Sequence, residues 1–341
     1  MDNGELKRLS VQMLGALDEE MRLVMKMDER TDPFYDPFYG MLHYHMGWVD
    51  ANFEPVSIYN GKQIRPLMVM LTCHAAGGDW RQAVPAAAAV EMLHNFSLIH
   101  DDIEDHSDTR RGRLTLWKIW GMEQAINSGD ALFGLAHLAM NRLIERGVGA
   151  ETAVFALRRF DETCVHLTNG QYHDMDFETR DTVSVDEYVQ MITGKTAALL
   201  SHSAELGAVV AGVDAETIAH YAAFGLNVGL AFQVKDDVLG IWGDEALTGK
   251  SAATDISTKK KTLPVLYGLS RSSALRDLYQ AESPSGFVEK AIALLDEAGA
   301  RGYAEGETAV YSQQAIQQLT AADPQGNALF QLADMLLTRQ K

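Results

Sequence analysis

The chain has 341 residues, of which 47% are hydrophobic and 22% charged, a balance typical of a packed globular protein and too apolar for a disordered one. The 29 lysines and arginines against 47 aspartates and glutamates give a formal net charge of −18. This balance argues against a nucleic-acid partner, because phosphate backbones are bound by basic patches. No stretch approaches the roughly 18 to 20 apolar residues of a membrane span, so none is expected.

The start of the chain and its cysteines indicate the compartment. The first ten residues, MDNGELKRLS, carry charges with no apolar run after them, which is not the pattern of a secretory signal. The two cysteines, Cys73 and Cys164, are too few for a disulfide framework or a metal knuckle. We therefore expect a cytoplasmic protein.

The hydrophobic pattern predicts an all-α fold. From Ala83 to Tyr267 the chain is nearly continuous in helix-favouring residues, and its apolar residues recur at spacings of three and four. A helix is expected at Val185–Ile192, entered from a loop, and a long apolar helix is expected over 221–234. The breaks between helices are short and mixed in composition, so none resembles a flexible linker. We expect a single domain over 1–341.

The densest chemistry lies at 100–106, with the sequence HDDIEDH. On a helix that turns about 100° per residue, Asp101 and Asp105 share a face and Asp102 flanks them. Crowded carboxylates of this kind suit Mg²⁺, which bridges carboxylates to substrate phosphates. An acidic patch is more often only a solvated face, but residues 91–99 before it are largely apolar and drive the helix inward.

A second acidic pair, Asp236 and Asp237, ends another apolar helix in the run FQVKDDVLGIWGD. Basic residues follow both clusters: Arg110 and Arg111 after the first, and Lys250 with the lysines at 259–261 after the second. Arginine and lysine side chains bind phosphate oxygens. The economical account is two facing half-sites for metal and phosphate. A histidine-aspartate metal phosphohydrolase is an alternative, but it leaves the arginine pair, the second aspartate pair and the lysine loop unused.

The order of these motifs resembles the polyprenyl synthetase family of trans-isoprenyl diphosphate synthases. The landmarks GKQIRP, EMLHNFSLIHDDIEDHSDTRRG, GQYHD, GKTAAL, FQVKDDVLGIWGD, TGK and KKKTLP span 61–264 in that family's order. The resemblance implies an isoprenoid-synthase-type helical bundle around a deep central cavity, usually a homodimer. It also implies the reaction: Mg²⁺-assisted ionisation of an allylic diphosphate, attack by the double bond of isopentenyl diphosphate, and loss of a proton.

The resemblance assigns roles to individual positions of this sequence. The ligands of the expected two to three Mg²⁺ ions are Asp101, Asp102, Asp105, Asp236 and Asp237. The side chains on the allylic diphosphate are Arg110, Lys195, Lys250 and Lys260. Those on isopentenyl diphosphate are Lys62, Arg65, His94 and Arg111. The catalytic side chains are Lys195, Thr196 and Gln233, the last two with oxygens near the developing cation.

One position departs from the family's pattern. The second motif commonly has an aspartate at its fifth position, and this chain has Gly240 there. Asp244, acting through a metal-bound water, is one possible replacement; alternatively Asp236 and Asp237 suffice, because water and phosphate complete the shell of Mg²⁺.

The residues before Asp101 bear on product length. An aromatic residue five positions upstream, Phe96, with the small Ser97 next to it, is associated by resemblance with a C20 product, geranylgeranyl diphosphate. Helical projection alone places Phe96 about 140° from Asp101 and does not make it the stopper. Farnesyl diphosphate (C15), a longer chain, and a non-catalytic partner subunit remain alternatives. A terpene cyclase would leave Lys62 and the second diphosphate site without a ligand.

Overall fold

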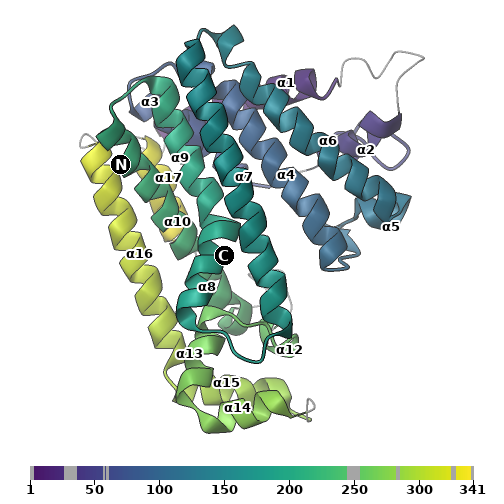
Figure 1. The fold of residues 1–341 in the computed structure, drawn as a ribbon, viewed down its shortest axis with the longest axis vertical. Helices are drawn as coiled ribbons and strands as arrows, with labels where there is room; N and C mark the ends of the chain where they lie inside the picture. The colour runs from purple at the N-terminus through teal and green to yellow at the C-terminus, as the bar shows by residue number, and fades with distance from the viewer. Residues whose placement is uncertain are drawn as a thin grey trace. The chain divides into compact units, whose positions relative to one another are not determined.

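The computed structural model describes residues 4–26, 37–56, 58, 61–243, 254–281, 285–323 and 328–338. Over these ranges the elements are almost all helices, and the only sheet is a two-stranded hairpin (Figure 1). The predicted all-α class is therefore confirmed. In the same ranges, no helix combines the length and the apolar character that a membrane crossing needs.

The elements keep the chain order that Figure 1 labels. The α-helices are α1 (Gly4–Val24), α2 (Pro37–His45), α3 (Ile64–Ala75), α4 (Val84–Glu104), α5 (Leu116–Trp120), α6 (Met122–Asn141), α7 (Ala150–Thr179), α8 (Val185–Ile192), α9 (Ala198–Ala211), α10 (Ala215–Trp242), α12 (Thr254–Ser257), α13 (Leu263–Arg271), α14 (Ser273–Gln280), α15 (Phe287–Glu297), α16 (Ala300–Ala322) and α17 (Ala328–Leu337). The other elements are the strands β1 (Thr109–Arg110) and β2 (Arg113–Leu114), the 3₁₀ turns η2 (Trp80–Ala83) and η3 (Ile144–Arg146), and the π-helical turn η4 (Thr193–Ala197).

The chain divides into two compact units, each assembled from two segments. The first unit comprises Met1–Asp161 and Ser203–Ile218, and the second comprises Glu162–His202 and Ala219–Lys341. The single domain and the central cavity expected from the sequence stay predictions.

Helix α4 is the buried centre of the first unit. Every residue from Val84 to Leu93 is buried, including four consecutive alanines. A helix that is apolar on all sides belongs in a protein interior. It packs against α1, α3 and α6, and Figure 1 shows α6 running beside it. This packing fixes the direction in which α4 delivers its polar end at 100–105.

A short hairpin follows α4. Strands β1 and β2 pair antiparallel, with Arg110 opposite Arg113. Arg111 and Gly112 connect them with φ angles of 52° and 75°, as in a type I′ turn, whose twist matches that of the flanking strands. The expectation of nearly continuous helix from Ala83 was wrong at this point. Strands of two residues carry no alternating pattern that a sequence can reveal.

The second unit contains α8 and α10, whose positions the sequence predicts well. Helix α8 begins after Ser184, and a capping box fixes its start: the Glu187 amide donates to Ser184 Oγ at 3.2 Å, and the Ser184 amide donates to Glu187 Oε2 at 2.8 Å. Helix α10 contains the predicted apolar stretch 221–234, and its Phe224 and Val234 are fully buried.

Candidate active site

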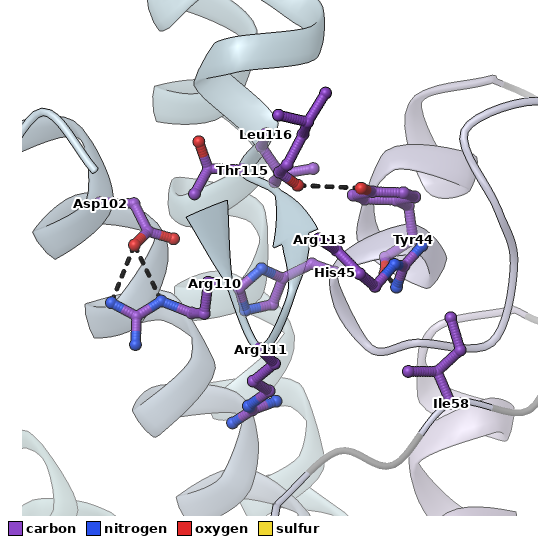
Figure 2. A pocket seen from close by; sticks show the side chains of 10 residues that line it. Tyr44, His45, Ile58, Asp102, Arg110, Arg111, Arg113, Thr115 and Leu116 are labelled. Carbon is purple, nitrogen blue, oxygen red and sulfur yellow. Dashed lines mark hydrogen bonds and ion pairs between the residues drawn. The ribbon is translucent and has the colours of Figure 1, made fainter. Parts of the chain in front are cut away.

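The first aspartate motif lies at the carboxyl end of α4, and one of its carboxylates has a tight partner. Asp102 is only 3% exposed, and its Oδ1 accepts from Nε and Nη2 of Arg110, both at 2.8 Å (Figure 2). Burial raises the pKa of Asp102, and the guanidinium of Arg110 opposes that shift. Asp101 is half-buried and Asp105 is exposed. These two carboxylates, one helical turn apart, are the more accessible members of the motif.

The hairpin after α4 is held by the end of α2. Arg113 donates from Nη1 to the Tyr44 carbonyl and from Nη2 to the Val49 carbonyl, each at 2.8 Å. Its guanidinium carbon lies 3.7 Å from the centroid of the Tyr44 ring. The Tyr44 hydroxyl in turn donates to the Leu114 carbonyl at 2.9 Å. These hydrogen bonds to backbone carbonyls and the cation–π contact fix the hairpin, and with it the positions of Arg110 and Arg111.

A pocket lies beside this hairpin, and Figure 2 shows the side chains that line it. They include His45, Asp102, Arg110, Arg111 and Arg113. The Nε2 atom of His45 is buried and has no hydrogen-bond partner in the described part of the chain. Burial, together with the charges of Arg111 and Arg110, lowers the pKa of His45 from 6.5 to about 3. His45 is therefore neutral near pH 7.

His45 is a site residue that the sequence analysis did not select. Its only local companion is His43, two positions away, and side chains at that spacing diverge on a helix. In the structure the two do differ: the His43 ring nitrogen Nε2 lies 2.8 Å from the Met25 carbonyl, away from the arginines. No spacing rule separates the two histidines, so only the fold distinguishes them.

Three of the four residues predicted to hold isopentenyl diphosphate are brought together in the first unit. Nη1 of Arg65 lies 3.3 Å from Nε2 of His94. Arg111 lies beside Gly61, since a Cβ added there would be 3.6 Å from its Nη2 atom. Gly61 has a φ of +87°, a conformation that favours glycine and sets the path of the chain into Lys62. Burial lowers the pKa of His94 well below 6.5, as do Arg65 and Arg111.

In the second unit, the GKTA segment forms the π-helical turn η4 between α8 and α9. Such wide turns are frequent at functional sites. Helix α7 approaches this turn closely, because a Cβ on Gly170 would lie 2.1 Å from the Lys195 amide nitrogen and one on Gly194 would lie 3.0 Å from Gly170 Cα. Across this glycine contact, Nζ of Lys195 reaches Oδ2 of Asp174 at 2.5 Å.

The catalytic pair predicted from the sequence also meets in the second unit. The Thr196 hydroxyl donates to Oε1 of Gln233 at 2.9 Å, and Nε2 of Gln233 donates to Oδ1 of Asp237 at 3.1 Å. The other oxygen of Asp237 accepts from the Tyr188 hydroxyl and from the Leu263 amide. Burial raises the pKa of Asp237 to about 7, although these hydrogen bonds oppose the shift. Both carboxylate oxygens of Asp237 are thus engaged by protein groups.

Phe96 lies in a row of aromatic rings within the first unit. Its ring centroid is 4.7 Å from that of His100 on the same helix and 5.2 Å from that of Phe133 on α6. The row continues from Phe133 to His137 at 4.6 Å. Phe133 is a second residue missed by the sequence analysis, because nothing in its local sequence marks it as a neighbour of Phe96.

Of the remaining predicted residues, the structure describes Ser97 and Lys260 but not Lys250 or Asp244. The Ser97 hydroxyl donates to the His94 carbonyl at 2.8 Å. Lys260 is exposed, at the end of a turn that its amide closes onto the Asp255 carbonyl at 2.8 Å. Lys250 and Asp244 lie outside the described residues. The roles of these residues stay predictions.

The sequence and the fold identify the family. A model of the polyprenyl synthetase family matches residues 47–295. The chain belongs to the polyprenyl synthetase family. It is accordingly a trans-prenyltransferase with the isoprenyl synthase helical-bundle fold, as the motifs predicted.

Similar proteins carry two product names. The chain is 44% identical over 270 residues to a protein of Mycobacterium tuberculosis named geranylgeranyl diphosphate synthase, covering 77% of this chain and 76% of that protein. It is 41% identical over 267 residues to another protein of that organism named (2E,6E)-farnesyl diphosphate synthase, covering 78% and 72%. A solved geranylgeranyl pyrophosphate synthetase from Pyrococcus horikoshii superposes with a TM-score of 0.86 at 31% identity, covering 98% of both chains.

The donor chemistry of this prenyl synthetase fits the metal that its family implies. Each aspartate motif offers carboxylate oxygens, which are the ligands that Mg²⁺ prefers. Across the described ranges, no three histidine, cysteine, aspartate or glutamate side chains form a ready-made metal cluster. Mg²⁺ is usually bound through one or two carboxylates together with waters and substrate phosphates. The separated carboxylates suit an ion that arrives with a diphosphate.

Proposed function

We propose that this chain condenses isopentenyl diphosphate with allylic diphosphates, head to tail and in trans, and ends at geranylgeranyl diphosphate. The observation that carries the product length is the ring of Phe96, held between His100 and Phe133. The relative named geranylgeranyl diphosphate synthase supports the same length. Farnesyl diphosphate is the alternative, favoured by the relative named for that product.

The first unit supplies the groups for isopentenyl diphosphate. Arg65, His94, Arg111 and Lys62 bind its diphosphate oxygens. Nε of Arg65 is buried without a hydrogen-bond partner in the described part of the chain, a donor that a bound anion would satisfy. Planar guanidinium groups bind phosphate through two parallel hydrogen bonds, which orients the substrate as well as holding it.

The two aspartate motifs hold the allylic diphosphate through two to three Mg²⁺ ions. Bound Mg²⁺ supplies the positive charge that stabilises the departing diphosphate. Asp101, Asp105 and Asp236 are the ligands that this proposal favours. The assignment of Asp102 and Asp237 to metal stays a prediction. Oδ1 of Asp102 accepts from Arg110 and both oxygens of Asp237 accept from protein groups, so we favour for these two residues the role of orienting their partners.

Cations and oxygens of the chain complete the work of ionisation. Lys195, Lys260, Lys250 and Arg110 bind the leaving diphosphate oxygens. Asp174 fixes the ammonium of Lys195, so its charge is positioned before the reaction starts. Thr196 and Gln233 present their oxygens to the developing carbocation. The departing diphosphate accepts the proton lost from the product, and we assign no side chain as base.

We further propose a cytoplasmic homodimer. Helices α6 and α7 expose large apolar side chains, including Leu138, Val154, Val165 and Tyr172. Val154 is 67% and Val165 65% exposed, and residues eleven apart lie on one face of a helix. Contiguous exposed apolar side chains often mark a protein interface. The cysteines Cys73 and Cys164 are buried free thiols, in keeping with a reducing compartment.

Product chain length is the deciding measurement. Purified protein is incubated with isopentenyl diphosphate, Mg²⁺ and, separately, C5, C10 and C15 allylic diphosphates, and the dephosphorylated alcohols are separated. A single C20 product is expected. A C15 or longer product keeps the enzyme and contradicts the assigned length. No product from any primer, with folded protein, indicates a partner subunit instead.

Phe96→Ala tests the role of the aromatic row. Removing the ring is expected to lengthen the product by at least one C5 unit. Trp80→Ala is the control: Trp80 is a buried aromatic residue of η2, so its loss tests whether removing a packed ring of the first unit alone alters the product. If neither variant forms a longer product, Phe96 does not limit chain length and has an ordinary packing role.

A further inference from the structure

Gly240 occupies the fifth position of the second aspartate motif, where the family commonly has a carboxylate. The structure shows what stands in the space of the missing side chain. A Cβ added to Gly240 would lie 2.2 Å from Oδ2 of Asp255 and 3.0 Å from its Cγ. Real Cβ atoms essentially never approach another heavy atom within 3.0 Å. The carboxylate of Asp255 therefore fills the place that a side chain at position 240 would need.

Packing holds Asp255 there. Its neighbour Ile256 is fully buried in the same apolar cluster as Ile241, the residue after Gly240. Four residues further along, the Lys260 amide donates to the Asp255 carbonyl at 2.8 Å and closes a turn. The buried Ile256 and this closed turn both fix the backbone on the C-terminal side of Asp255, and from there its carboxylate reaches α10.

The position that Asp255 fills has a counterpart in the first motif. Asp101 and Asp105 are four residues apart on α4 and share a face, and Asp236 and position 240 have the same spacing on α10. A carboxylate that lies against the Cα of Gly240 is therefore on the face of Asp236. The charge of Asp255 also contributes to the raised pKa of Asp237 and of Tyr188, in keeping with its place beside the second motif.

We propose that Asp255 provides the carboxylate that position 240 lacks, and that Asp236 and Asp255 together bind one Mg²⁺ of the diphosphate complex. This inference rests on the proposed function. It answers the question that the sequence left open between Asp244 and an incomplete motif. It also reverses the simple expectation for Gly240→Asp: the new side chain displaces Asp255 rather than adding a ligand.

The test measures Mg²⁺ dependence without turnover. Inorganic diphosphate is held at a fixed concentration, and the Mg²⁺ concentration that gives half of the thermal stabilisation is determined for each variant. Asp255→Asn is expected to raise this midpoint about 10- to 100-fold, the loss typical when a metal site loses one supporting carboxylate. Asp277→Asn, an exposed aspartate on α14, is the control and is expected to leave the midpoint unchanged.

Two further variants move the carboxylate itself. Gly240→Ala removes no charge and by helix propensity alone should stabilise α10, yet it is expected to raise the Mg²⁺ midpoint because it displaces Asp255. This variant decides the matter if Asp255→Asn fails to fold. Gly240→Asp combined with Asp255→Ala returns a carboxylate to the same face and is expected to recover most of the lost affinity.

The possible outcomes distinguish a failure of the role of Asp255 from a failure of the proposed function. A wild-type protein that shows no Mg²⁺-dependent stabilisation by diphosphate and forms no product overturns the proposed function. A wild-type protein that responds, with unchanged midpoints in Asp255→Asn and Gly240→Ala, overturns only the role of Asp255. If the Mg²⁺ midpoint of the Gly240→Asp, Asp255→Ala double variant is as high as that of Asp255→Asn, the two positions are not equivalent. This outcome also overturns the role of Asp255.

Discussion

Replacing His45 by glutamine should remove part of the acid sensitivity of this protein. The folded state keeps the ring of His45 neutral, because burial and the nearby charges of Arg111 and Arg110 lower its pKa from 6.5 to about 3. In the unfolded chain the same ring accepts a proton near pH 6.5. Between these two values the unfolded state binds a proton that the folded state does not, so stability falls as the pH falls.

The two pKa values set the size of the effect. The free energy of unfolding that this one ring removes is small at pH 7, about 2 kcal/mol at pH 5, and about 5 kcal/mol once the pH falls below 3, since one pKa unit corresponds to about 1.4 kcal/mol. The pKa of His94 shifts in the same direction, and because burial and the arginines come before His45 among the causes of that shift, most of its contribution cancels in the comparison.

The assay is urea unfolding of wild type and His45→Gln at several pH values between 7.5 and 5. The stability of each protein at pH 7.5 is its own reference, and the quantity compared is the free energy of unfolding that each protein loses on acidification. His45→Gln is expected to lose about 2 kcal/mol less than wild type between pH 7 and pH 5. His74→Gln removes an exposed histidine of α3 and is the control. Equal losses in wild type and His45→Gln would refute the reasoning.

Three further predictions concern single substitutions. Asp101→Asn should abolish turnover while circular dichroism stays unchanged, and near-normal turnover would remove Asp101 from the metal site. Glu20→Ala should lower the free energy of unfolding by about 1.5 to 3 kcal/mol, because the buried carboxylate of Glu20 accepts from Arg142 at 2.6 Å and from Arg146 at 2.5 Å, and an unchanged unfolding midpoint would contradict this. Tyr188→Phe should cost about 1 to 3 kcal/mol, since it leaves the buried carboxylate of Asp237 without one donor; no change in the unfolding midpoint would contradict this.

Much of the fold and some of the site can be predicted from the sequence, because capping motifs and apolar runs act over short stretches of the chain. The capping box at Ser184 determines the start of α8, and the apolar run at 221–234 determines that α10 is buried. Residues to which the motifs gave the same role also lie together in two cases: Arg65 is within hydrogen-bond range of His94, and Thr196 of Gln233.

What the tertiary structure alone decided is which partner each charged side chain has. Asp102 and Asp237 look equivalent to their neighbours in sequence, yet Oδ1 of Asp102 accepts from Arg110 and both oxygens of Asp237 accept from protein groups. His45 has no local feature that sets it apart, and Asp255 is fifteen positions from Gly240. Such contacts join residues that are distant along the chain, and helical periodicity constrains only neighbours within a few turns. The sequence therefore determined the family, the helices and the chemistry available, while packing determined which of those groups are accessible to substrate.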